Sequence, residues 1–543
     1  MLTVSNLSLQ FGKRVLFDDV NIKFTQGNCY GVIGANGAGK STFLKILSGE
    51  IESTTGSISI EKDARMTVLK QDHFAYDDFT VLNTVIMGHE QLYNTKKELD
   101  EIYLKPDFSD ADGLRAGELN EQFEEMNGWN AESDAATLLS NLGVVEADHH
   151  KTMGELNTNQ KVRILLAQAL YGNPDILILD EPTNDLDAET IMWLEDFLAD
   201  FRNTVIVVSH DRHFLDAVCT HIADVDHKKI NLHSGNYTFW YESSQLASRQ
   251  MADKNKKNEQ KRKELLDFIQ RFSANASKAK QATSRKKALE KLDISEIMPS
   301  SRRYPGIVFK QTREVGNQIL TVDNLKKSLG DELLFDKLNF TIEKGDKIAF
   351  RSRNSLAVTK LFQILADDNG EKADEGDIDW GVTVTKSYLP NENSSYFDMD
   401  LNLVDWLRQY SEEKDETFIR GFLGRMLFSG EETQKECNVL SGGEKVRCLM
   451  SKIMLEEGNV LILDEPTSHL DLESITKLNE ALVEYPGTVL FTSHDHQFTQ
   501  TVATRIIEIA PNGMIDKMME YDEYLQDPLS KEQRIELYDG VKA

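Results

Sequence analysis

The stretch NCYGVIGANGAGKSTFLKIL, residues 28–47, decides the fold of this chain. Its middle, from Gly34 to Ser41, fits the pattern G-x-x-x-x-G-K-[ST], with an apolar run typical of a buried strand before it and a helical pattern after it. Glycines allow successive backbone N–H groups to converge on phosphate oxygens, and the start of a helix adds positive potential. The sequence therefore predicts an α/β domain with a loop that cradles nucleotide phosphates, made of Gly34, Ala35, Asn36, Gly37, Ala38, Gly39, Lys40, Ser41 and Thr42.

This stretch has a counterpart, DKIAFRSRNSLAVTKLFQIL at 346–365, which aligns with it without a gap at an offset of 318 residues. Three further pairs of similar segments follow the same order along the chain: NLSLQFGKRVLF (6–17) with NLKKSLGDELLF (324–335), ILILDEPTNDLD (176–187) with VLILDEPTSHLD (460–471), and VIVVSHDRHF (205–214) with VLFTSHDHQF (489–498). Ordered matches predict a duplicated domain of roughly 220–240 residues. In each copy, short Val, Ile and Leu runs alternate with amphipathic stretches, which is typical of helices around a mainly parallel sheet.

Composition indicates a soluble globular protein of several domains. The chain has 543 residues, of which 40% are hydrophobic and 28% are charged. No apolar run approaches the roughly 18 residues that cross a bilayer, and the N-terminus lacks a signal-peptide pattern. The four cysteines are scattered without paired spacing, as is typical of reduced thiols. We therefore expect a cytoplasmic protein.

Charge is distributed unevenly along the chain. The net charge of −29 argues by itself against nucleic-acid binding. Residues 251–303, however, contain 15 Lys or Arg and 7 Asp or Glu. The pattern indicates a basic segment that projects from an acidic body.

The two copies differ in spacing and are separated by this basic segment. There are 85 positions from Gln71 to Leu156 but only 50 from Pro390 to Leu440, so the first copy contains an insertion, which we place at about 89–130 as a helical pair. Between the copies, apolar spacing predicts one helix through about Arg271 and a second helix from Arg285 to Leu292. The predicted organisation is a first domain at 1–240, a helical hairpin linker at 241–316 and a second domain at 317–543. A solvated spacer is the alternative for the linker.

Carboxylates and a histidine follow the predicted strands of the first copy. Asp180 would hold Mg²⁺ together with the Ser41 hydroxyl, and Glu181 would polarise the attacking water. His210 would contact the γ-phosphate and hold that water in line, Gln71 would sense the metal and the nucleophile, and Phe11 would stack on adenine. Taken singly, His210 would more often be structural and Phe11 a core residue. Their order within the motif set favours catalysis.

Together these motifs identify a family resemblance. The phosphate loop, the glutamine, LSGGE (440–444), D-E-P-T-x-x-L-D and S-H-D resemble those of the ATP-binding-cassette ATPases over the whole chain outside the linker. Two cassettes with an inserted arm and a basic linker look like the ABC-F family, and RFSANASKAKQATSR with SSRRYPGIVF resembles its YbiT-type branch. The resemblance implies tandem P-loop cassettes that hydrolyse ATP with Mg²⁺. It also implies a translation factor that enters the ribosomal exit site and directs its linker toward the P-site tRNA, with no stable membrane partner.

The family resemblance also implies a crosswise pairing of the two cassettes within one monomer. Each ATP would lie between the phosphate loop of one cassette and the signature of the other, so Ser441, Gly442, Gly443 and Glu444 would complete the first site. The first signature position reads Leu156-Asn-Thr-Asn-Gln160 and would face the loop of the second copy.

That second loop has lost its phosphate chemistry. Gly39 corresponds to Ala357 and Lys40 to Val358, while Ser41 becomes Thr359, which could still bind a metal. Further changes at the same offset are Gly34 to Ser352 and Phe11 to Leu329. Gln71 corresponds to Pro390, whereas Asp464, Glu465 and His494 are retained. We expect one competent site and one degenerate site. The alternative is that Ser352–Thr359 binds nucleotide in an unorthodox way.

Basic residues near the predicted hairpin tip are suited to RNA phosphates. They are Lys278, Lys280, Arg285, Lys286 and Lys287, and Arg271, Arg302 and Arg303 either assist them or are surface charges. These residues favour rRNA and tRNA as partners. Two other functions stay open: a factor that protects ribosomes from antibiotics, and an ATPase subunit of a membrane transporter.

Overall fold

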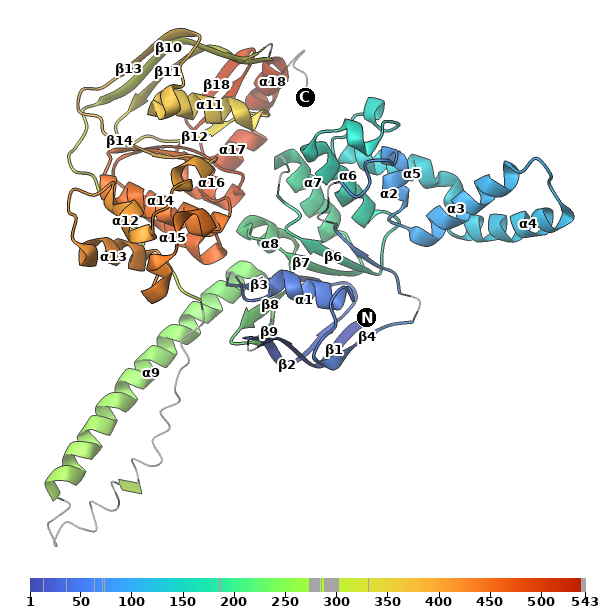
Figure 1. Ribbon diagram of the computed structural model, residues 1–543, viewed down its shortest axis with the longest axis horizontal. Coiled ribbons are helices and arrows are strands. Elements are labelled where there is room, and N and C mark those ends of the chain that lie inside the picture. Colours follow the sequence, from blue (N-terminus) through green and yellow to red (C-terminus); the bar gives the residue numbers. More distant parts are fainter. Residues whose placement is uncertain are drawn as a thin grey trace.

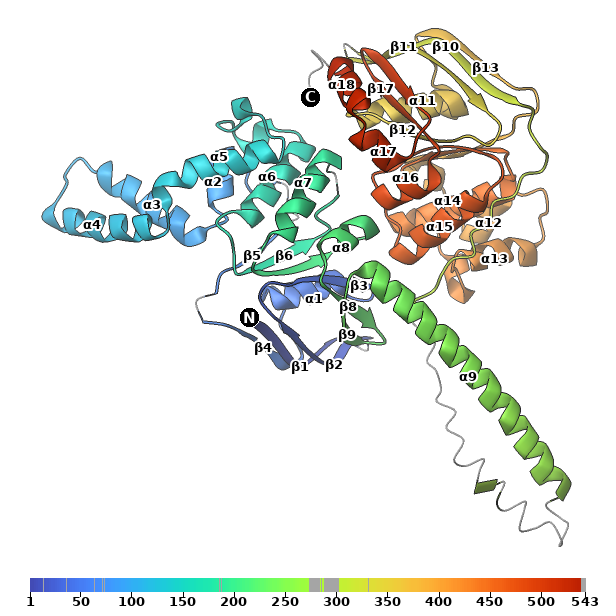
Figure 2. The ribbon, with the colours of Figure 1, turned by 180° about the vertical axis from the view of Figure 1, so that it is seen from behind.

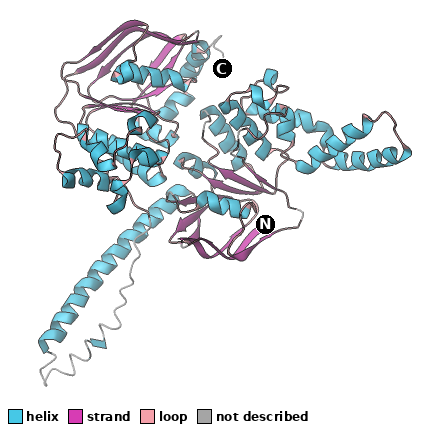
Figure 3. Cartoon of the chain, in the orientation of Figure 1, coloured by secondary structure: helices cyan, strands magenta, loops and turns pink. Residues whose placement is uncertain are grey.

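The structure, a computed structural model, describes residues 1–12, 14–35, 37–62, 64–70, 72, 74–184, 186, 188–272, 284, 286–287, 302–330 and 332–538. Two α/β lobes lie side by side, and a long helix leaves from between them (Figure 1). We call the lobes cassette 1 (residues 1–236) and cassette 2 (residues 317–538). Each lobe contains both helices and strands, and some of the strands lie at its outer edge (Figure 3).

The centre of cassette 1 is a six-stranded sheet with the order β5-β6-β7-β3-β8-β9. Its first five strands are parallel, and β9 is antiparallel to β8. β6 and β7 are buried on both faces, which explains their unbroken apolar sequences. The strands are β3 (Cys29–Gly34), β5 (Met66–Val68), β6 (Ile176–Asp180), β7 (Thr204–Val208), β8 (His221–Asp226) and β9 (Lys229–Ser234). The predicted mainly parallel sheet is confirmed.

A second, antiparallel sheet of three strands covers the phosphate-loop helix. It contains β1 (Leu2–Phe11), β2 (Arg14–Phe24) and β4 (Thr55–Ile60), in the order β2-β1-β4. Phe17 and Phe24 of this sheet share a hydrophobic core with Phe43 of α1 (Lys40–Leu47). The sequence patterns had not predicted this separate sheet.

Cassette 2 repeats both sheets with the same strand orders, β14-β15-β16-β12-β17-β18 and β11-β10-β13. Even a backbone detail recurs, since Asn6 and Asn324 both have a positive φ, of 49° and 50°. The strands are β10 (Gln318–Leu329), β11 (Glu332–Glu343), β12 (Lys347–Arg351), β13 (Glu375–Trp380), β14 (Lys386–Leu389), β15 (Val460–Asp464), β16 (Thr488–Thr492), β17 (Arg505–Ala510) and β18 (Gly513–Lys517). The fold is therefore two tandem copies of one P-loop α/β domain.

The helices show where the two cassettes differ. Cassette 1 has α2 (Val81–Ile86), α5 (Ala131–Asn141), α6 (Thr158–Leu170), α7 (Ala188–Ala199) and α8 (Arg212–Val218). Between α2 and α5 it adds α3 (Glu90–Tyr103) and α4 (Asp110–Glu125), a helical pair that projects from the lobe (Figure 1). Arg115 of α4 pairs with Glu98 of α3 at 2.8 Å. This pair occupies the segment in which the spacing placed the insertion.

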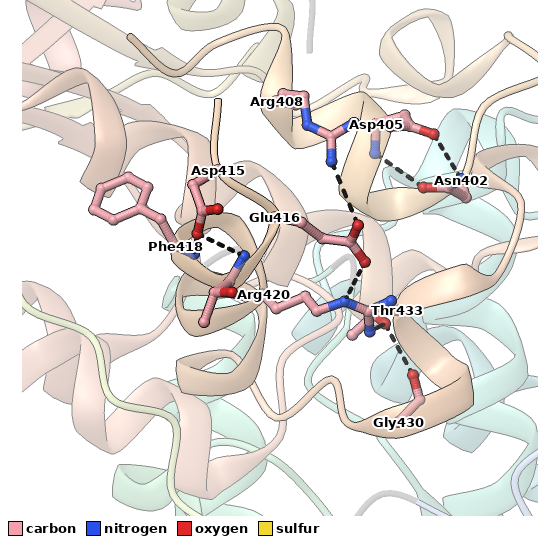
Figure 4. A network of polar contacts seen from close by, with 10 residues as sticks. Asn402, Asp405, Arg408, Asp415, Glu416, Phe418, Arg420, Gly430 and Thr433 are labelled. Atoms are coloured by element: carbon pink, nitrogen blue, oxygen red, sulfur yellow. Dashed lines mark hydrogen bonds and ion pairs between the residues drawn. The ribbon is translucent and has the colours of Figure 1, made fainter. Parts of the chain in front are cut away.

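Among the described residues of cassette 2, the helical region is shorter and contains no such arm. It contains α11 (Ser355–Ala366), α12 (Leu403–Arg408), α13 (Glu416–Arg425), α14 (Gly442–Glu456), α15 (Leu472–Glu484), α16 (His496–Val502), α17 (Tyr521–Gln526) and α18 (Pro528–Leu537). A polar network ties α12 and α13 to the turn at Gly430–Gln434 (Figure 4). In it, Glu416 pairs with Arg420 at 2.8 Å and with Arg408 at 4.0 Å.

The long helix is α9 (Tyr237–Phe272), which begins directly after cassette 1 and runs away from both lobes (Figure 2). It covers the predicted helix through about Arg271. The predicted second helix, Arg285–Leu292, lies almost wholly outside the described residues, and Lys286 and Lys287 are helical. Among the described helices, none combines the length and apolar character needed to span a bilayer.

The two cassettes contact each other through the starts of equivalent helices. Asp211 caps α8 and Asp495 caps α16, each by accepting a backbone N–H from a phenylalanine three residues on. Beside these caps, the rings of His213 and His496 lie with centroids 4.0 Å apart. The contact relates equivalent elements of the two copies, as expected for cassettes that pair within one chain.

Candidate nucleotide site

The phosphate loop of cassette 1 depends on two glycines with left-handed backbone. Gly37 has a φ of 75° and Gly39 a φ of 101°, conformations that other L-residues rarely adopt. A Cβ on Gly39 would also lie 2.9 Å from the ring of Phe17. Gly34, Ala35, Ala38, Ser41 and Thr42 occupy the same loop and the first turn of α1, while Asn36 lies outside the described residues. The backbone is therefore open where phosphate oxygens would approach.

Lys40 is the first residue of α1 and is buried at 9% exposure. Its Nζ donates to the carbonyl oxygen of Gly34 at 2.9 Å. Burial lowers the pKa of Lys40, and the carboxylates of Glu181, Glu473, Asp471 and Asp180 act in the opposite direction. A desolvated cation beside several carboxylates is suited to neutralise an incoming triphosphate.

Glu181 and His210 form a pair at the ends of β6 and β7. The Oε2 atom of Glu181 accepts the backbone N–H of His210 at 3.0 Å, and the Nε2 atom of His210 lies 3.3 Å from Oε1. Glu181 has a φ of 52°, a strained conformation of the kind often found at functional sites. Burial raises the pKa of Glu181 to about 7 and lowers the pKa of His210 to about 4. At neutral pH, His210 is thus neutral and Glu181 is poised to accept a proton.

Ser41 and Asp180 line one pocket of about 430 Å³ with Leu69, Asp72 and Tyr76. A hydroxyl and a carboxylate are hard oxygen ligands, the type that Mg²⁺ prefers, so the donor set fits this metal. Gln71, the third predicted metal-sensing residue, lies outside the described residues. Every residue lining the pocket belongs to cassette 1.

Phe11 lies at the end of β1 and is 53% exposed. Directly across the strand pair is Arg14, whose guanidinium donates to the carbonyl oxygen of Gly37 at 2.9 Å. The exposed ring is therefore next to the phosphate loop, free to stack. Arg14 was missed by the motif analysis, although its counterpart in the second copy, Glu332, reverses the charge and could have revealed it.

The equivalent loop of cassette 2 is replaced by helix. α1 begins at Lys40, which corresponds to Val358, but α11 begins three residues earlier at Ser355. Asn354 caps this extra turn by accepting the backbone N–H of Leu356 at 3.0 Å. Ala357 stands where Gly39 needs a φ of 101°, and it takes a helical conformation instead. The amides that would meet phosphate are directed into a helix.

Other groups reinforce this loss. The carboxylate of Glu332 accepts from the Asn354 side chain at 2.9 Å and places negative charge beside the loop. Lys360, the nearest lysine in sequence, pairs with Glu371 at 2.7 Å. The chain's last described residue, Tyr538, is 6% exposed, its hydroxyl accepts the backbone N–H of Arg353 at 3.0 Å, and the Arg353 guanidinium lies 4.2 Å from its ring centroid. The degenerate loop is therefore covered by the chain itself.

Cassette 2 nevertheless keeps the strained carboxylate. Glu465 has a φ of 48° and accepts the backbone N–H of His494 at 3.2 Å, with Nε2 of His494 3.4 Å from Oε1. The geometry matches that of Glu181 and His210. The contact between Glu465 and His494 joins the ends of the neighbouring strands β15 and β16.

The two signature positions share a helix cap but not its glycines. Ser441 caps α14 in a capping box with Glu444, and Asn157 caps α6 in a capping box with Gln160. A Cβ on Gly443 would lie 2.7 Å from the carbonyl oxygen of His469, so the loop after β15 rests directly on Gly442 and Gly443. The Ser441–Glu444 segment does not line the pocket at Ser41 and Asp180.

That loop, residues 468–474, carries cassette 2 into contact with cassette 1. Leu472 is part of the hydrophobic core cluster of cassette 1. The carboxylates of Asp471 and Glu473 oppose the burial that lowers the pKa of Lys40, and Asp471 likewise opposes the burial that lowers the pKa of His210. The structure thus brings the loop, rather than the signature itself, to the candidate site.

The predicted RNA-binding residues are only partly described. Lys278, Lys280 and Arg285 lie outside the described residues, whereas Lys286 and Lys287 are exposed. Arg302 is not the surface charge that one alternative expected. Its side chain is 6% exposed and is held between Asp224 and Glu473. No local sequence signal distinguished it from exposed Arg303.

Comparison with known proteins identifies the family. Models of the ABC transporter family match residues 17–184 and 335–468, and an extension of that family matches 223–309. The chain is 59% identical to the ABC transporter ATP-binding protein YkpA of Bacillus subtilis, covering 99% of this chain and all of that protein. It is 44% identical to the probable ATP-binding protein YbiT of Escherichia coli O157:H7, covering 97% of this chain and 99% of that protein.

More distant relatives narrow the assignment. Energy-dependent translational throttle protein EttA of Escherichia coli K12 is 32% identical, over 94% of this chain and 93% of EttA. ABC transporter F family member 2 of Arabidopsis thaliana is 30% identical, over 96% of this chain and 78% of that protein. The solved structure of RNase-L Inhibitor shares the tandem fold, with a TM-score of 0.61, 18% identity and coverage of 98% and 92%. The chain is a cassette ATPase and belongs to the ABC-F family.

Proposed function

We propose that this chain is a ribosome-associated translation factor that hydrolyses ATP at one composite site. The observation that carries the proposal is the contrast between the two loops. Cassette 1 keeps the left-handed glycines and a buried Lys40, whereas α11 and Tyr538 fill the equivalent loop of cassette 2. A single site for ATP hydrolysis, connected to a projecting helix, is suited to bind a partner and to release it after hydrolysis.

The residues of cassette 1 divide the work between binding and proton transfer. Lys40 and the loop amides bind the triphosphate, Phe11 stacks on adenine, and Ser41, Asp180 and Gln71 hold Mg²⁺, which when bound supplies charge neutralisation for the transferred phosphoryl group. Glu181, with a pKa of about 7, accepts the proton of the attacking water. Neutral His210 orients that water through its ring nitrogen.

Ser441 to Glu444 complete the site when the cassettes close. Support comes from the 468–474 loop, which rests on Gly442 and Gly443 and also reaches the core of cassette 1. Closure would carry the start of α14 toward the phosphate loop along the same path. Helix starts attract phosphate, and the two glycines leave the approach clear.

The basic linker and the relatives of this chain support the ribosome as its partner. α9 has 36 residues, a length of about 54 Å at 1.5 Å per residue, and contains eight Lys or Arg. EttA, which aligns over nearly the whole chain, is called a translational throttle protein. We propose that the chain acts in the cytoplasm as a monomer at the ribosomal exit site. Its linker, including Lys278, Lys280, Arg285, Lys286 and Lys287, would contact rRNA and P-site tRNA.

Sedimentation of the Glu181→Gln variant tests this function. The isosteric amide cannot accept the proton, so ATP should be trapped and the closed state should persist. With Mg²⁺ and ATP, the variant should co-migrate with ribosomes through a sucrose gradient, and it should be released when ATP is omitted.

Glu465→Gln is the matched control, because it changes the equivalent carboxylate in the degenerate site. It should sediment like the unchanged chain. A Glu181→Gln protein that stays at the top of the gradient, or one that co-purifies with a membrane permease, contradicts the proposal.

A further inference from the structure

Arg302 lies where the linker returns to the cassettes, and it contacts three parts of the molecule. Its Nη2 atom donates to Oδ1 of Asp224 on β8 at 2.6 Å. Its Nε atom lies 2.7 Å from Oε1 of Glu473, at the start of α15. Its guanidinium carbon lies 4.4 Å from the ring centroid of Trp240, in the first turn of α9. One side chain therefore joins cassette 1, cassette 2 and the root of the linker.

The two ends of the linker are anchored in different cassettes. At the outgoing end, Tyr237 and Trp240 belong to the hydrophobic core cluster of cassette 1. At the returning end, Ile307 and Phe309 belong to the hydrophobic core cluster of cassette 2. The ring centroid of Phe309 lies 6.1 Å from that of Tyr485. A movement of one cassette against the other therefore shifts one leg of the linker past the other. Arg302 is on the returning leg and reaches back across that boundary.

Glu473 places Arg302 next to the candidate site. It belongs to the 468–474 loop, in which His469 rests on the signature glycines and Leu472 enters the core of cassette 1. Burial lowers the pKa of Lys40, and the charges of Asp471 and Glu473 oppose that change. The path from the linker to the site thus consists of one arginine and one short loop.

We propose that Arg302 is a positioning residue that couples the linker to ATP hydrolysis in cassette 1. It holds the 468–474 loop at Lys40 only while the two linker legs are in register. A load on the linker, such as a bound partner, would therefore change the hydrolysis rate through this side chain. The inference rests on the proposed site in cassette 1 and adds the route by which that site is regulated.

The chemistry of the contact explains why arginine is needed. Burial raises the pKa of both Asp224 and Glu473, and the positive charge of Arg302 opposes that change. A planar guanidinium can serve two carboxylates through different edges and stack on an indole at the same time. A lysine carries the same charge but has no such fork.

Steady-state kinetics provide the first test. Arg302→Lys and Glu473→Gln should each lower kcat at least fivefold, the lower range for coupling between sites, with little change in KM for ATP. Arg303→Lys, the exposed neighbour, should match the unchanged chain. A kcat equal to that of the unchanged chain in both Arg302→Lys and Glu473→Gln overturns the proposal, as does a change confined to KM.

Tryptophan emission provides a second readout that a merely structural role would not move. In the Glu181→Gln background, Mg²⁺ and ATP should change the emission, and Trp240→Phe should remove most of that change. Arg302→Lys should also diminish it. If Trp240→Phe leaves the ATP-dependent change in emission intact, the contact between Arg302 and Trp240 does not respond to ATP, and the proposal is wrong.

The two proposals fail differently. If the site assignment is wrong, Glu181→Gln keeps its ATPase activity. If only the coupling is wrong, Glu181→Gln is inactive while Arg302→Lys is fully active.

Discussion

The two phosphate loops of this chain share a sheet, a strand order and a sequence register, yet their backbones differ: the loop of cassette 1 has left-handed glycines, and the equivalent residues of cassette 2 are helical. In cassette 1, Gly37 and Gly39 turn the backbone so that α1 begins at Lys40. In cassette 2, Ser355 and Ala357 stand at these positions, and the helix extends through them. Loss of the left-handed glycines thus changes the backbone itself as well as the side chains. The comparison teaches that a phosphate site is lost when the backbone conformation of its loop is lost.

The largest effect should separate the two carboxylates. Glu181→Gln should lower kcat for ATP hydrolysis by roughly 10²-fold or more, the range for loss of a general base, because the amide cannot take the proton that Glu181 is proposed to accept from water. Glu465→Gln should change kcat by less than twofold, as measured by phosphate release. Equal losses in both variants would mean that both sites hydrolyse ATP.

Nucleotide affinity should distinguish the two lysines next. Lys40→Met removes a charge-assisted contact worth roughly 1.5–3 kcal/mol, so ATP should bind about ten- to a hundredfold more weakly. Lys360→Met should leave affinity unchanged, because this lysine is occupied by Glu371. Equilibrium dialysis measures both values and also gives one ATP per chain. A stoichiometry of two would show that Ser352–Thr359 binds nucleotide.

The pH dependence should follow Glu181. Burial raises its pKa to about 7, so the carboxyl is protonated and inactive as a base below that value. The kcat/KM for ATP reports the free enzyme, and it should rise about tenfold per pH unit below pH 7 and level off above it. A stopped-flow or phosphate-release profile between pH 5.5 and 8.5 measures this range (about three units). A profile that stays flat contradicts the assignment of Glu181 as the base.

The smallest effect should come from the helix that replaced the second loop. Asn354→Ala removes the cap of α11 and should cost about 1 kcal/mol of the free energy of unfolding of cassette 2. ATPase activity should be unchanged. Ser355→Ala, one position on, is the control and should have little effect on urea unfolding. Loss of activity in Asn354→Ala would indicate that this loop still contributes to hydrolysis.

Much of the fold followed from local pattern. Apolar runs before Gly34 and Asp180 predicted buried parallel strands. The motifs that follow these two runs predicted the phosphate loop and the role of Glu181. The antiparallel three-stranded sheet was not predicted, because its strands pair through irregular registers that interrupt their alternation. The roles of Tyr538 and Arg302 could not be predicted either. Each depends on contacts between segments far apart in sequence, and although Arg302 lies in the stretch SSRRYPGIVF, that stretch does not indicate which residues it contacts.

The tail of the chain has one more consequence. Because Tyr538 fills the duplicated loop, a molecule with the proposed single site passes directly between an empty and a loaded form. Such a molecule has no intermediate with ATP bound in one of two competent sites. The dwell time on a partner would then be set by one stochastic event, and individual dwell times should follow a single exponential.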